Sequence, residues 1–401
     1  LQGGDDTYTL DASSTGGTVS GGTGGSDTLA IGIGVTATIL LGEVANATIN
    51  GVGYSNFDNL SATGANGALT VTAAAGGSTI TTGSAGDNVT AGASADNITT
   101  GGGADTVNIT SGSYANDTLD GGADTDTLAI TGGGTVNMNL ATISGFDNVS
   151  INNTSATTFI TDTDNLVISV TGGNAVADIT LSATGTQNLT ITGTGADIVT
   201  LASGSGANGV NTGGGADTVN GAVEAGDVVD LDADNDTFEY RTIGGDVRGG
   251  AGTDTITVLA DAGVVSLDLT VGTGNGNYSG FENISAAGAN GAITAKAVST
   301  GSTITTGSAG DNVTAGGSAD AINTGAGNDS VNITSSTYIG DTLNGGDDTD
   351  TLAITGGNTV NMTLANITNF ESVTIDGTAT TFTANGLDLA ISAGGGGNTT
   401  T

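Results

Sequence analysis

The chain contains no cysteine, histidine, proline or tryptophan, and its only basic residues are Arg241, Arg248 and Lys296. Without Cys or His it cannot provide a Cys/His zinc site, a thiol nucleophile or a Ser-His-Asp triad, so we expect no enzyme activity. Nucleic acids and anionic lipids bind clustered positive charge, so we expect no nucleic-acid partner. No run of about 18 apolar residues occurs, which predicts no membrane insertion.

The composition combines features of disordered and of folded chains. Forty-one acidic residues against three basic ones give a net charge of −38, and 73 of the 401 residues are glycine. Both features are typical of disorder. However, 36% of the residues are hydrophobic, and Ile, Val and Leu recur at regular intervals. A repeat protein that uses glycine in its turns accounts for both observations.

A long repeat divides the chain. STITTGSAGDNVTAG occurs at residues 78–92 and again at 302–316, which is 224 positions later. The same offset relates TDTLAITGG at 125–133 and 349–357. We therefore expect a first long repeat unit over residues 1–230 and a second, truncated copy over residues 231–401.

A short repeat with a period of nine lies inside the long one. It reads ITTGSAGDN from Ile80 and VTAGASADN from Val89, and the second unit repeats it from Ile304. These nonads, or pieces of them, lie near 80–107, 192–199 and 212–219 in the first unit and near 249–256 and 304–331 in the second. Between them, short alternating runs such as TVNMNL and NLVISV predict strands bounded by turns.

Each nonad provides a three-residue strand and a glycine-rich turn. Alternation in the strand points the Ile or Val inward and the next residue outward. Two nonads then form one coil, so we expect Ile80 to lie beneath Ile98 and Asp87 to stack on Asp105, with Asp96 at the opposite edge. The predicted fold class is all-β: a parallel β-helix or β-roll solenoid with calcium-binding, glycine-rich turns.

Stacked aspartates create an electrostatic problem. Neighbouring strands lie about 4.8 Å apart, and two carboxylates at that spacing repel by about 3 kcal/mol at an effective dielectric constant of about 20. A simple Asx-turn explains one such aspartate. It does not explain why an aspartate recurs at the same position of three successive turns in both units. Ca²⁺ between turns would reverse the repulsion, because it binds carboxylates and turn carbonyls together. We therefore predict multiple calcium ions.

The nonads resemble a known family. The pattern G-G-x-G-x-D-x-U-x is that of RTX, or haemolysin-type, calcium-binding repeats, and GGAGTDTI at 249–256 matches it. In the other nonads Thr or Ala often replaces the first glycine. The rest of the chain is similar to RTX-containing bacterial surface-layer proteins and giant adhesins.

The resemblance implies calcium bound by turn carbonyls and by the aspartate of each repeat. The implied metal ligands are Asp87, Asp96, Asp105, Asp124, Asp126, Asp197, Asp217, Asp254, Asp311, Asp320, Asp329, Asp348 and Asp350. Four phenylalanines that precede an acidic residue, Phe57, Phe146, Phe281 and Phe370, are interpreted as core residues where a coil changes width.

These features favour a structural function. We expect a secreted bacterial protein, extracellular or on the cell surface, that is stabilised by calcium and self-assembles as a homo-oligomer or polymer into a surface layer or filament. Cell-surface polysaccharide is a further candidate partner. The alternatives are the passive stalk of a giant adhesin, an ice-binding protein that uses rows such as Thr81 over Thr99, and the repeat region of a secreted RTX exoenzyme.

Overall fold

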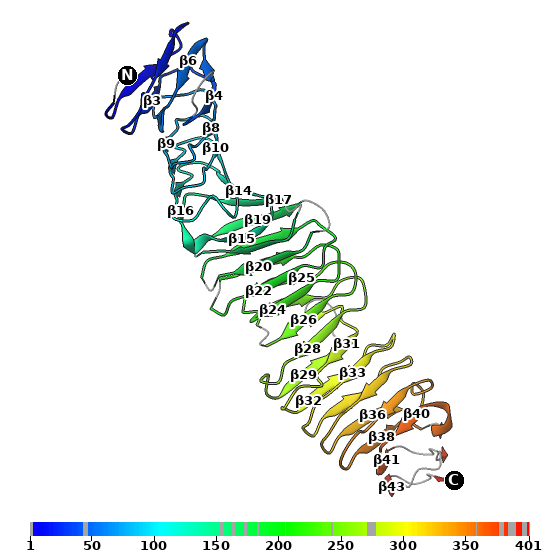
Figure 1. Ribbon diagram of the computed structural model, residues 1–401. Helices are drawn as coiled ribbons and strands as arrows, with labels where there is room; N and C mark the ends of the chain where they lie inside the picture. The colour runs from blue at the N-terminus through cyan, green and yellow to red at the C-terminus, as the bar shows by residue number, and fades with distance from the viewer. Residues whose placement is uncertain are drawn as a thin grey trace. The chain divides into compact units, whose positions relative to one another are not determined.

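The structure of the chain is a computed structural model that describes residues 3–42, 47–152, 155–162, 165–171, 175–182, 184–204, 206–241, 244–270, 278–357, 359–376, 381–383, 390–394 and 399–400. The chain divides into two compact units, Leu1–Gly209 and Val210–Thr401. In both units the described strands follow one another as successive parallel rungs (Figure 1). The predicted all-β parallel solenoid is therefore confirmed. The boundary between sequence repeats at residue 230 stays a prediction.

Unit 1 contains three parallel sheets and one small mixed sheet. The first sheet has the order β1 (Thr7–Leu10), β3 (Thr28–Ile31), β7 (Asn59–Ser61), β9 (Thr79–Thr81), β11 (Asn97–Thr99), β13 (Thr118–Asp120) and β16 (Thr142–Ser144). The second has the order β4 (Ala37–Leu40), β8 (Leu69–Thr72), β10 (Asn88–Thr90), β12 (Thr106–Ile109), β14 (Thr127–Thr131), β17 (Asn148–Asn152), β19 (Leu166–Thr171) and β21 (Gln187–Ile191). The third comprises β15 (Gly134–Asn137), β18 (Thr157–Ile160), β20 (Ala177–Leu181) and β22 (Ile198–Leu201). In the small sheet, β6 (Val52–Ser55) pairs with β2 (Thr18–Ser20) in parallel and with β5 (Ala47–Ile49) in antiparallel fashion.

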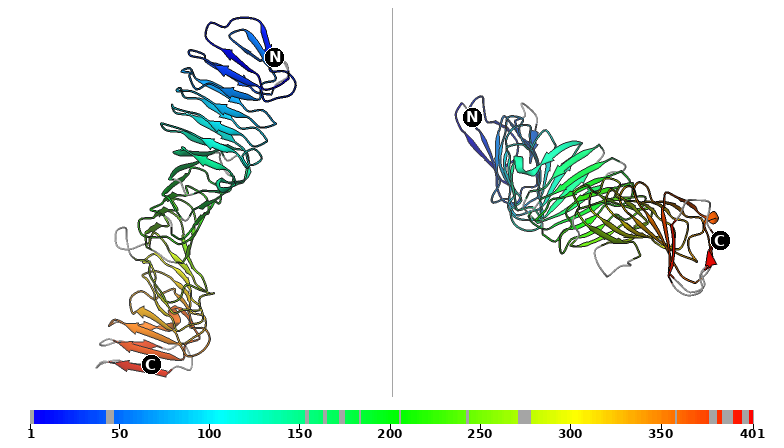
Figure 2. Two further views of the ribbon diagram at one scale, coloured as in Figure 1. Left: turned by 90° about the vertical axis from the view of Figure 1, so that its left-hand side faces the viewer. Right: turned by 90° about the horizontal axis from the view of Figure 1, so that it is seen from below.

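Unit 2 is likewise built of stacked parallel strands (Figure 2). Its longest sheet has the order β24 (Thr218–Gly221), β26 (Thr237–Tyr240), β28 (Thr255–Val258), β31 (Asn283–Ser285), β33 (Thr303–Thr305), β35 (Ala321–Asn323), β37 (Thr342–Asn344) and β40 (Asn366–Thr368). A second sheet has the order β29 (Val265–Asp268), β32 (Ile293–Lys296), β34 (Asn312–Thr314), β36 (Ser330–Thr334), β38 (Thr351–Thr355), β41 (Ser372–Asp376) and β43 (Ala390–Gly394). The remaining strands are β25 (Val228–Asp230), β27 (Asp246–Arg248) and β30 (Tyr278–Ser279) in one sheet, and β39 (Val360–Asn361), β42 (Thr381–Thr383) and β44 (Thr399–Thr400) in another. Strand β23 (Gly209–Asn211) contains the division between the units.

The nine-residue repeat sets the register of the strands. Ile98 in β11 pairs with Ile80 in β9, eighteen residues earlier, as the sequence predicted. The next strand, β13, places Leu119 on Ile98 after a longer turn. All three side chains are fully buried, whereas their strand neighbours point outward. The core is thus a column of aliphatic side chains, one from each rung, and longer turns are accommodated without a change of register.

Aromatic residues fill the same positions in the two units. Phe57, Phe146, Phe281 and Phe370 are all buried, which confirms their interpretation as core residues. Two further tyrosines each accept a backbone N–H through the hydroxyl, at the start of the 3-10 helices η1 (Met138–Leu140) and η2 (Met362–Leu364). The bonds run from Asn137 to Tyr114 and from Asn361 to Tyr338, both at 2.8 Å. The long repeat is therefore a repeat of structure as well as of sequence.

Close packing of the turns explains part of the glycine content. Gly327 has a φ of 118°, and a Cβ there would lie 2.5 Å from the carbonyl oxygen of Ala309 in the preceding coil. Gly103 occupies the same position in unit 1, with a φ of 107°. Any other residue would strain the backbone and clash with the turn below it. Within the described ranges, no helix is long and apolar enough to cross a membrane.

Removal of one core side chain should destabilise the solenoid. Ile98→Ala deletes a fully buried side chain between Ile80 and Leu119, so we expect a loss of about 2–5 kcal/mol of unfolding free energy in urea denaturation followed by circular dichroism. The neighbouring exposed substitution Asn97→Ala is the control and should cost about 0.5 kcal/mol or less. Equal effects of the two substitutions would contradict the assignment of the core column.

Candidate metal site: the aspartate ladders

The aspartate before each strand bonds to its own counterpart in the next coil. The backbone N–H of Asp87 donates to Oδ1 of Asp105 at 2.6 Å, and that of Asp105 donates to Oδ1 of Asp126 at 2.8 Å. The carbonyl of Asp87 in turn accepts the N–H of Thr106 at 2.8 Å. The carboxylate therefore extends the hydrogen bonds of the sheet one residue beyond the strand, where a backbone N–H would otherwise lack an acceptor. We call such a series an aspartate ladder.

Four long ladders occur among the described residues, two in each unit. They run through Asp6, Asp27 and Asp58; through Leu69, Asp87, Asp105, Asp126 and Asp147; through Asp217, Asp236, Asp254 and Glu282; and through Ile293, Asp311, Asp329, Asp350 and Glu371. Two shorter ladders run through Ser78, Asp96 and Asp117, and through Ser302, Asp320 and Asp341. In the nonad regions 80–107 and 304–331, one long and one short ladder thus serve two different sheets.

The structure brings most of the predicted ligands into these ladders. Eleven of them are buried: Asp87, Asp96, Asp105, Asp126, Asp197, Asp217, Asp254, Asp311, Asp320, Asp329 and Asp350. Ten of these accept a backbone N–H from an earlier coil through Oδ1, and Asp217 donates its own N–H to Asp236. Asp124 and Asp348 instead lie on exposed turns with φ of 82° and 83°. Their carboxylates accept the N–H of Gly103 and Gly327. Calcium binding by any of these residues stays a prediction.

The sequence analysis missed several ladder members. Asp27, Asp117, Asp236 and Asp341 are as deeply buried as the predicted ligands. Each is followed by Thr and then by a large core residue, as in Asp117-Thr118-Leu119. The turns before Asp27, Asp117 and Asp341 depart from the spacing of the nonads. Asp236 keeps that spacing to Asp254 but follows a turn without glycine, so a search based on period and glycine content finds none of the four. An aspartate two residues before a core position was the signal that would have identified them.

The ladder aspartates differ in whether their second carboxylate oxygen, Oδ2, accepts a hydrogen bond. Oδ2 of Asp96 and of Asp320 accepts the N–H of the glycine four residues earlier, at 2.6 Å in both cases. By contrast, the following six aspartates have a buried Oδ2 without a hydrogen-bond partner: Asp117, Asp126, Asp236, Asp254, Asp341 and Asp350. A buried acceptor without a partner costs about 1–3 kcal/mol, and more when it is charged. A proton or a cation on this oxygen would remove that cost.

Burial and stacking shift the ionisation of these groups. Burial, with the neighbouring carboxylates of Asp217 and Asp254 acting in the same direction, raises the pKa of Asp236 to about 7. Burial likewise raises the pKa of Asp117 to about 6, with the charge of Asp96 acting in the same direction. The corresponding members Asp105, Asp329 and Asp341 also have pKa values raised to about 6, chiefly by burial. The hydrogen bonds from backbone N–H groups lower these pKa values, but by less than burial raises them.

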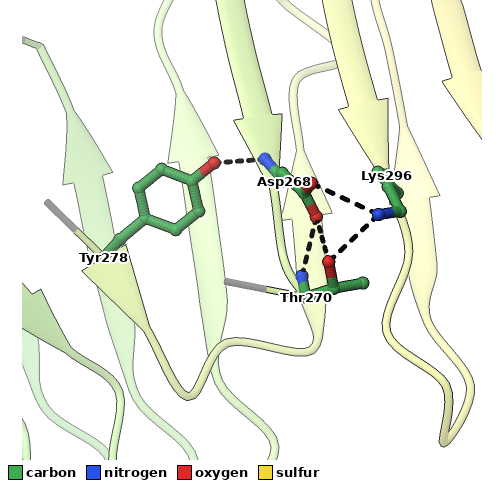
Figure 3. Close-up of polar contacts among 4 residues, drawn as sticks. All are labelled: Asp268, Thr270, Tyr278 and Lys296. Carbon is green, nitrogen blue, oxygen red and sulfur yellow. Dashed lines mark hydrogen bonds and ion pairs between the residues drawn. The ribbon is translucent and has the colours of Figure 1, made fainter. Parts of the chain in front are cut away.

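The basic residues of the chain do not neutralise the ladders. Lys296 lies 3.4 Å from Oδ2 of Asp268 and 3.2 Å from the hydroxyl of Thr270, in an exposed cluster beside Tyr278 (Figure 3). The two arginines contact other exposed acids, Asp230 and Asp261. None of these ion pairs of the described residues includes a ladder aspartate. Any charge compensation of the ladders must therefore come from protons or from bound cations.

The donors in the ladders suit calcium better than other metals. They are carboxylate and carbonyl oxygens, which are the ligands that Ca²⁺ prefers. The orphaned Oδ2 atoms of Asp126, Asp254 and Asp350 give each of these positions one buried oxygen available for a cation. Among the described residues, no three acidic side chains form a ready-made metal cluster. A calcium ion in a ladder would thus take much of its coordination from the turn carbonyls.

Comparison with known proteins does not assign the chain to a family. No protein-family model matches the chain, and no curated protein is similar to it in sequence. A parallel solenoid alone does not identify RTX repeats, because unrelated sequences form this architecture. The resemblance to RTX proteins thus depends on the nonads and stays a prediction.

The raised pKa values predict an unusual pH dependence of the metal-free chain. A carboxyl whose pKa rises on folding, here from about 3.9 to about 6 or 7, holds its proton more tightly in the folded state. Its contribution to stability is complete below about pH 4 and is lost as the pH rises through about 7. In EDTA, the melting temperature should therefore be higher at pH 5 than at pH 8. A melting temperature that rises from pH 5 to pH 8 would contradict this assignment.

Asp236→Asn supplies the matched variant for that experiment. The amide keeps an oxygen for the N–H of Asp217 and removes the charge, and Asn208 already accepts the N–H of Gln187 in this way at 2.9 Å. In EDTA at pH 8 we expect the variant to be more stable than the wild type by about 1–3 kcal/mol. At pH 5 the difference should shrink, because the wild-type carboxyl is then protonated.

Proposed function

We propose that this chain is part of an extracellular bacterial structural protein that calcium stabilises and that self-assembles into a surface layer or filament. The observation that carries the proposal is the stacking of buried carboxylates, coil after coil, with second oxygens that have no hydrogen-bond partner. A protein that uses neutral amides at these positions would need no cation. The repeated choice of aspartate therefore supports a fold that depends on one.

Calcium would act on folding through the residues of the ladders. When bound, the ion would supply positive charge beside the carboxylates of the ladders. The aspartates would hold it through Oδ2, while Oδ1 keeps its bond to the backbone N–H of the adjacent coil. Binding that occurs only in the folded state stabilises that state by mass action. At low calcium, the charge of −38 would instead favour an expanded chain.

The solenoid architecture supports self-association and a secreted location. Each rung presents a row of backbone N–H and C=O groups to the next rung, and an unpaired outermost rung templates further pairing. Calcium at millimolar concentration is available outside cells, and a chain without cysteine does not depend on disulfides there. Cell-surface polysaccharide is a proposed anchor for the assembly. RTX repeats are the proposed family of the nonads.

The proposed function is structural and not enzymatic. The sequence contains no His or Cys, and the buried carboxylates already have a role in hydrogen bonding between coils. A carboxylate that holds a backbone N–H on one oxygen and a cation on the other is unavailable as a general acid or base.

A calcium titration of the full chain at pH 8 tests the proposal. Circular dichroism in EDTA should show little β-structure or a low melting temperature, and calcium should raise the melting temperature strongly because it binds only the folded state. Magnesium at equal concentration is the control and should have a much smaller effect, since it dehydrates reluctantly and requires octahedral coordination. Identical melting curves in EDTA and in calcium would contradict the proposal.

Sedimentation and negative-stain microscopy test the assembly. In calcium we expect sheets or fibres that dissolve when EDTA is added. Folded, calcium-bound chains that remain monomeric at all concentrations would contradict self-assembly and favour the stalk of an adhesin.

A further inference from the structure

Every long ladder ends at a phenylalanine that is followed by an acidic residue. The four sequences are SNFDN, SGFDN, SGFEN and TNFES, and the acidic residues are Asp58, Asp147, Glu282 and Glu371. Each accepts the N–H of the last aspartate of its ladder, at 2.8–3.1 Å. The phenylalanine ring itself is buried in each case. The sequence motif therefore marks a defined structural end, which the nonad pattern does not include.

The residue before each phenylalanine turns its carbonyl toward the ladder. Asn56, Gly145, Gly280 and Asn369 all have left-handed backbone angles, with φ between 54° and 71°. A Cβ built on Gly249 would lie 2.3 Å from the carbonyl oxygen of Gly280 and 2.8 Å from Oδ2 of Asp254. At Gly345 the corresponding distances are 2.0 Å to the carbonyl oxygen of Asn369 and 2.8 Å to Oδ2 of Asp350. At both ends, the glycine lets the backbone pack closely against two oxygens, which face each other across a narrow space.

No donor satisfies the carboxylate oxygen in this space. Asp254 and Asp350 are fully buried, and Oδ2 of each has no hydrogen-bond partner. A carbonyl oxygen and a carboxylate oxygen that face one space repel each other unless a positive charge lies between them. The arrangement occurs at two sites in unit 2 whose local sequences differ. It is therefore a recurrent feature of the ladder end.

Unit 1 contains the counterparts of these two sites. At the end marked by Asp147, a Cβ on Gly121 would lie 2.3 Å from the carbonyl oxygen of Gly145, and Oδ2 of Asp126 is buried without a hydrogen-bond partner. A Cβ on Gly21 would lie 2.1 Å from the carbonyl oxygen of Asn56 and 2.8 Å from Oδ2 of Asp27. Here Asp27, Asn56 and Asp58 line a cavity of about 310 Å³. Asp27 is itself 2% exposed, so it presents a buried carboxylate to a space that is large enough for an ion and its water.

We propose that the ladder ends are cation sites that take ligands from outside the nonads, each binding one Ca²⁺. In unit 2 the ligands are Asp254, the carbonyl of Gly280 and Glu282 at one site, and Asp350, the carbonyl of Asn369 and Glu371 at the other. Two carboxylates and a backbone carbonyl in an irregular arrangement suit Ca²⁺, which accepts flexible coordination, better than Mg²⁺. This inference rests on the proposed calcium-dependent function and adds a set of ligands that the nonad pattern does not contain.

The glycine opposite each site has a role in this arrangement. Any side chain at Gly249 or Gly345 would occupy the space between the two oxygens and would collide with a backbone carbonyl. The acid follows the buried phenylalanine, the left-handed residue directs the carbonyl, and the glycine permits the close approach of both oxygens. These three sequence features recur together because the site requires all of them.

Calcium stoichiometry tests the proposal. The double variant Glu282→Gln/Glu371→Gln keeps an acceptor for the N–H of Asp254 and of Asp350 but removes one carboxylate from each site. After equilibrium dialysis of the full chain at pH 8, elemental analysis should show two fewer calcium ions per chain than in the wild type. The matched control Glu224→Gln/Glu239→Gln removes the same charge outside the ladders and should bind as many ions as the wild type. Melting in calcium, followed by circular dichroism, verifies that each variant is folded.

Two further variants make the result decisive. Glu282→Asp/Glu371→Asp should keep both ions, because unit 1 carries Asp58 and Asp147 at this position. Asp58→Asn/Asp147→Asn repeats the measurement in unit 1 and should also lose two ions. If the wild type binds calcium and both amide variants bind the same number of ions with the same affinity, the ladder-end sites are wrong while the proposed function stands. If the wild type binds no calcium, both proposals are wrong.

Discussion

The structure depends on one hydrogen bond that recurs in successive coils: a backbone N–H donates to the carboxylate of the next aspartate in the ladder. This bond extends each sheet into the turn and fixes the register of the coils. It also requires carboxylates to be buried in a column, where their charges repel. The same aspartates therefore stabilise the contacts between coils and give the ladders their affinity for protons or cations.

The sequence predicted the rungs of the solenoid but not the details of its turns. Ile80, Ile98 and their equivalents were placed correctly because a period of nine with one inward residue permits only one stacking arrangement. The ladder bonds could not be predicted, since the pattern does not show which backbone N–H lacks an acceptor. For the same reason Asp117 and Asp236 were missed, although their burial equals that of the predicted ligands. The acids after Phe57 and Phe281 were visible in the sequence, but only the structure places them at the ladder ends.

A natural contrast within unit 1 supports the electrostatic interpretation. Gln187 and Asn208 occupy a step like that of the ladders, where the N–H of Gln187 donates to Oδ1 of Asn208. A neutral amide is thus sufficient for the inter-coil hydrogen bond. The aspartates elsewhere add a charge that this bond does not need, and that burial makes costly. Their use is explained if the charge binds a cation, which makes the fold respond to calcium.

The most direct measurement is the protonation state of the buried aspartates, observed by ¹³C NMR of their side-chain carboxyls. In metal-free protein at pH 6, the account predicts a distinct set of protonated aspartates, and calcium added at constant pH should abolish their signals and release protons. If all aspartates are ionised at pH 6 without metal, and calcium leaves their signals unchanged, the ladders do not bind cations and the account is wrong.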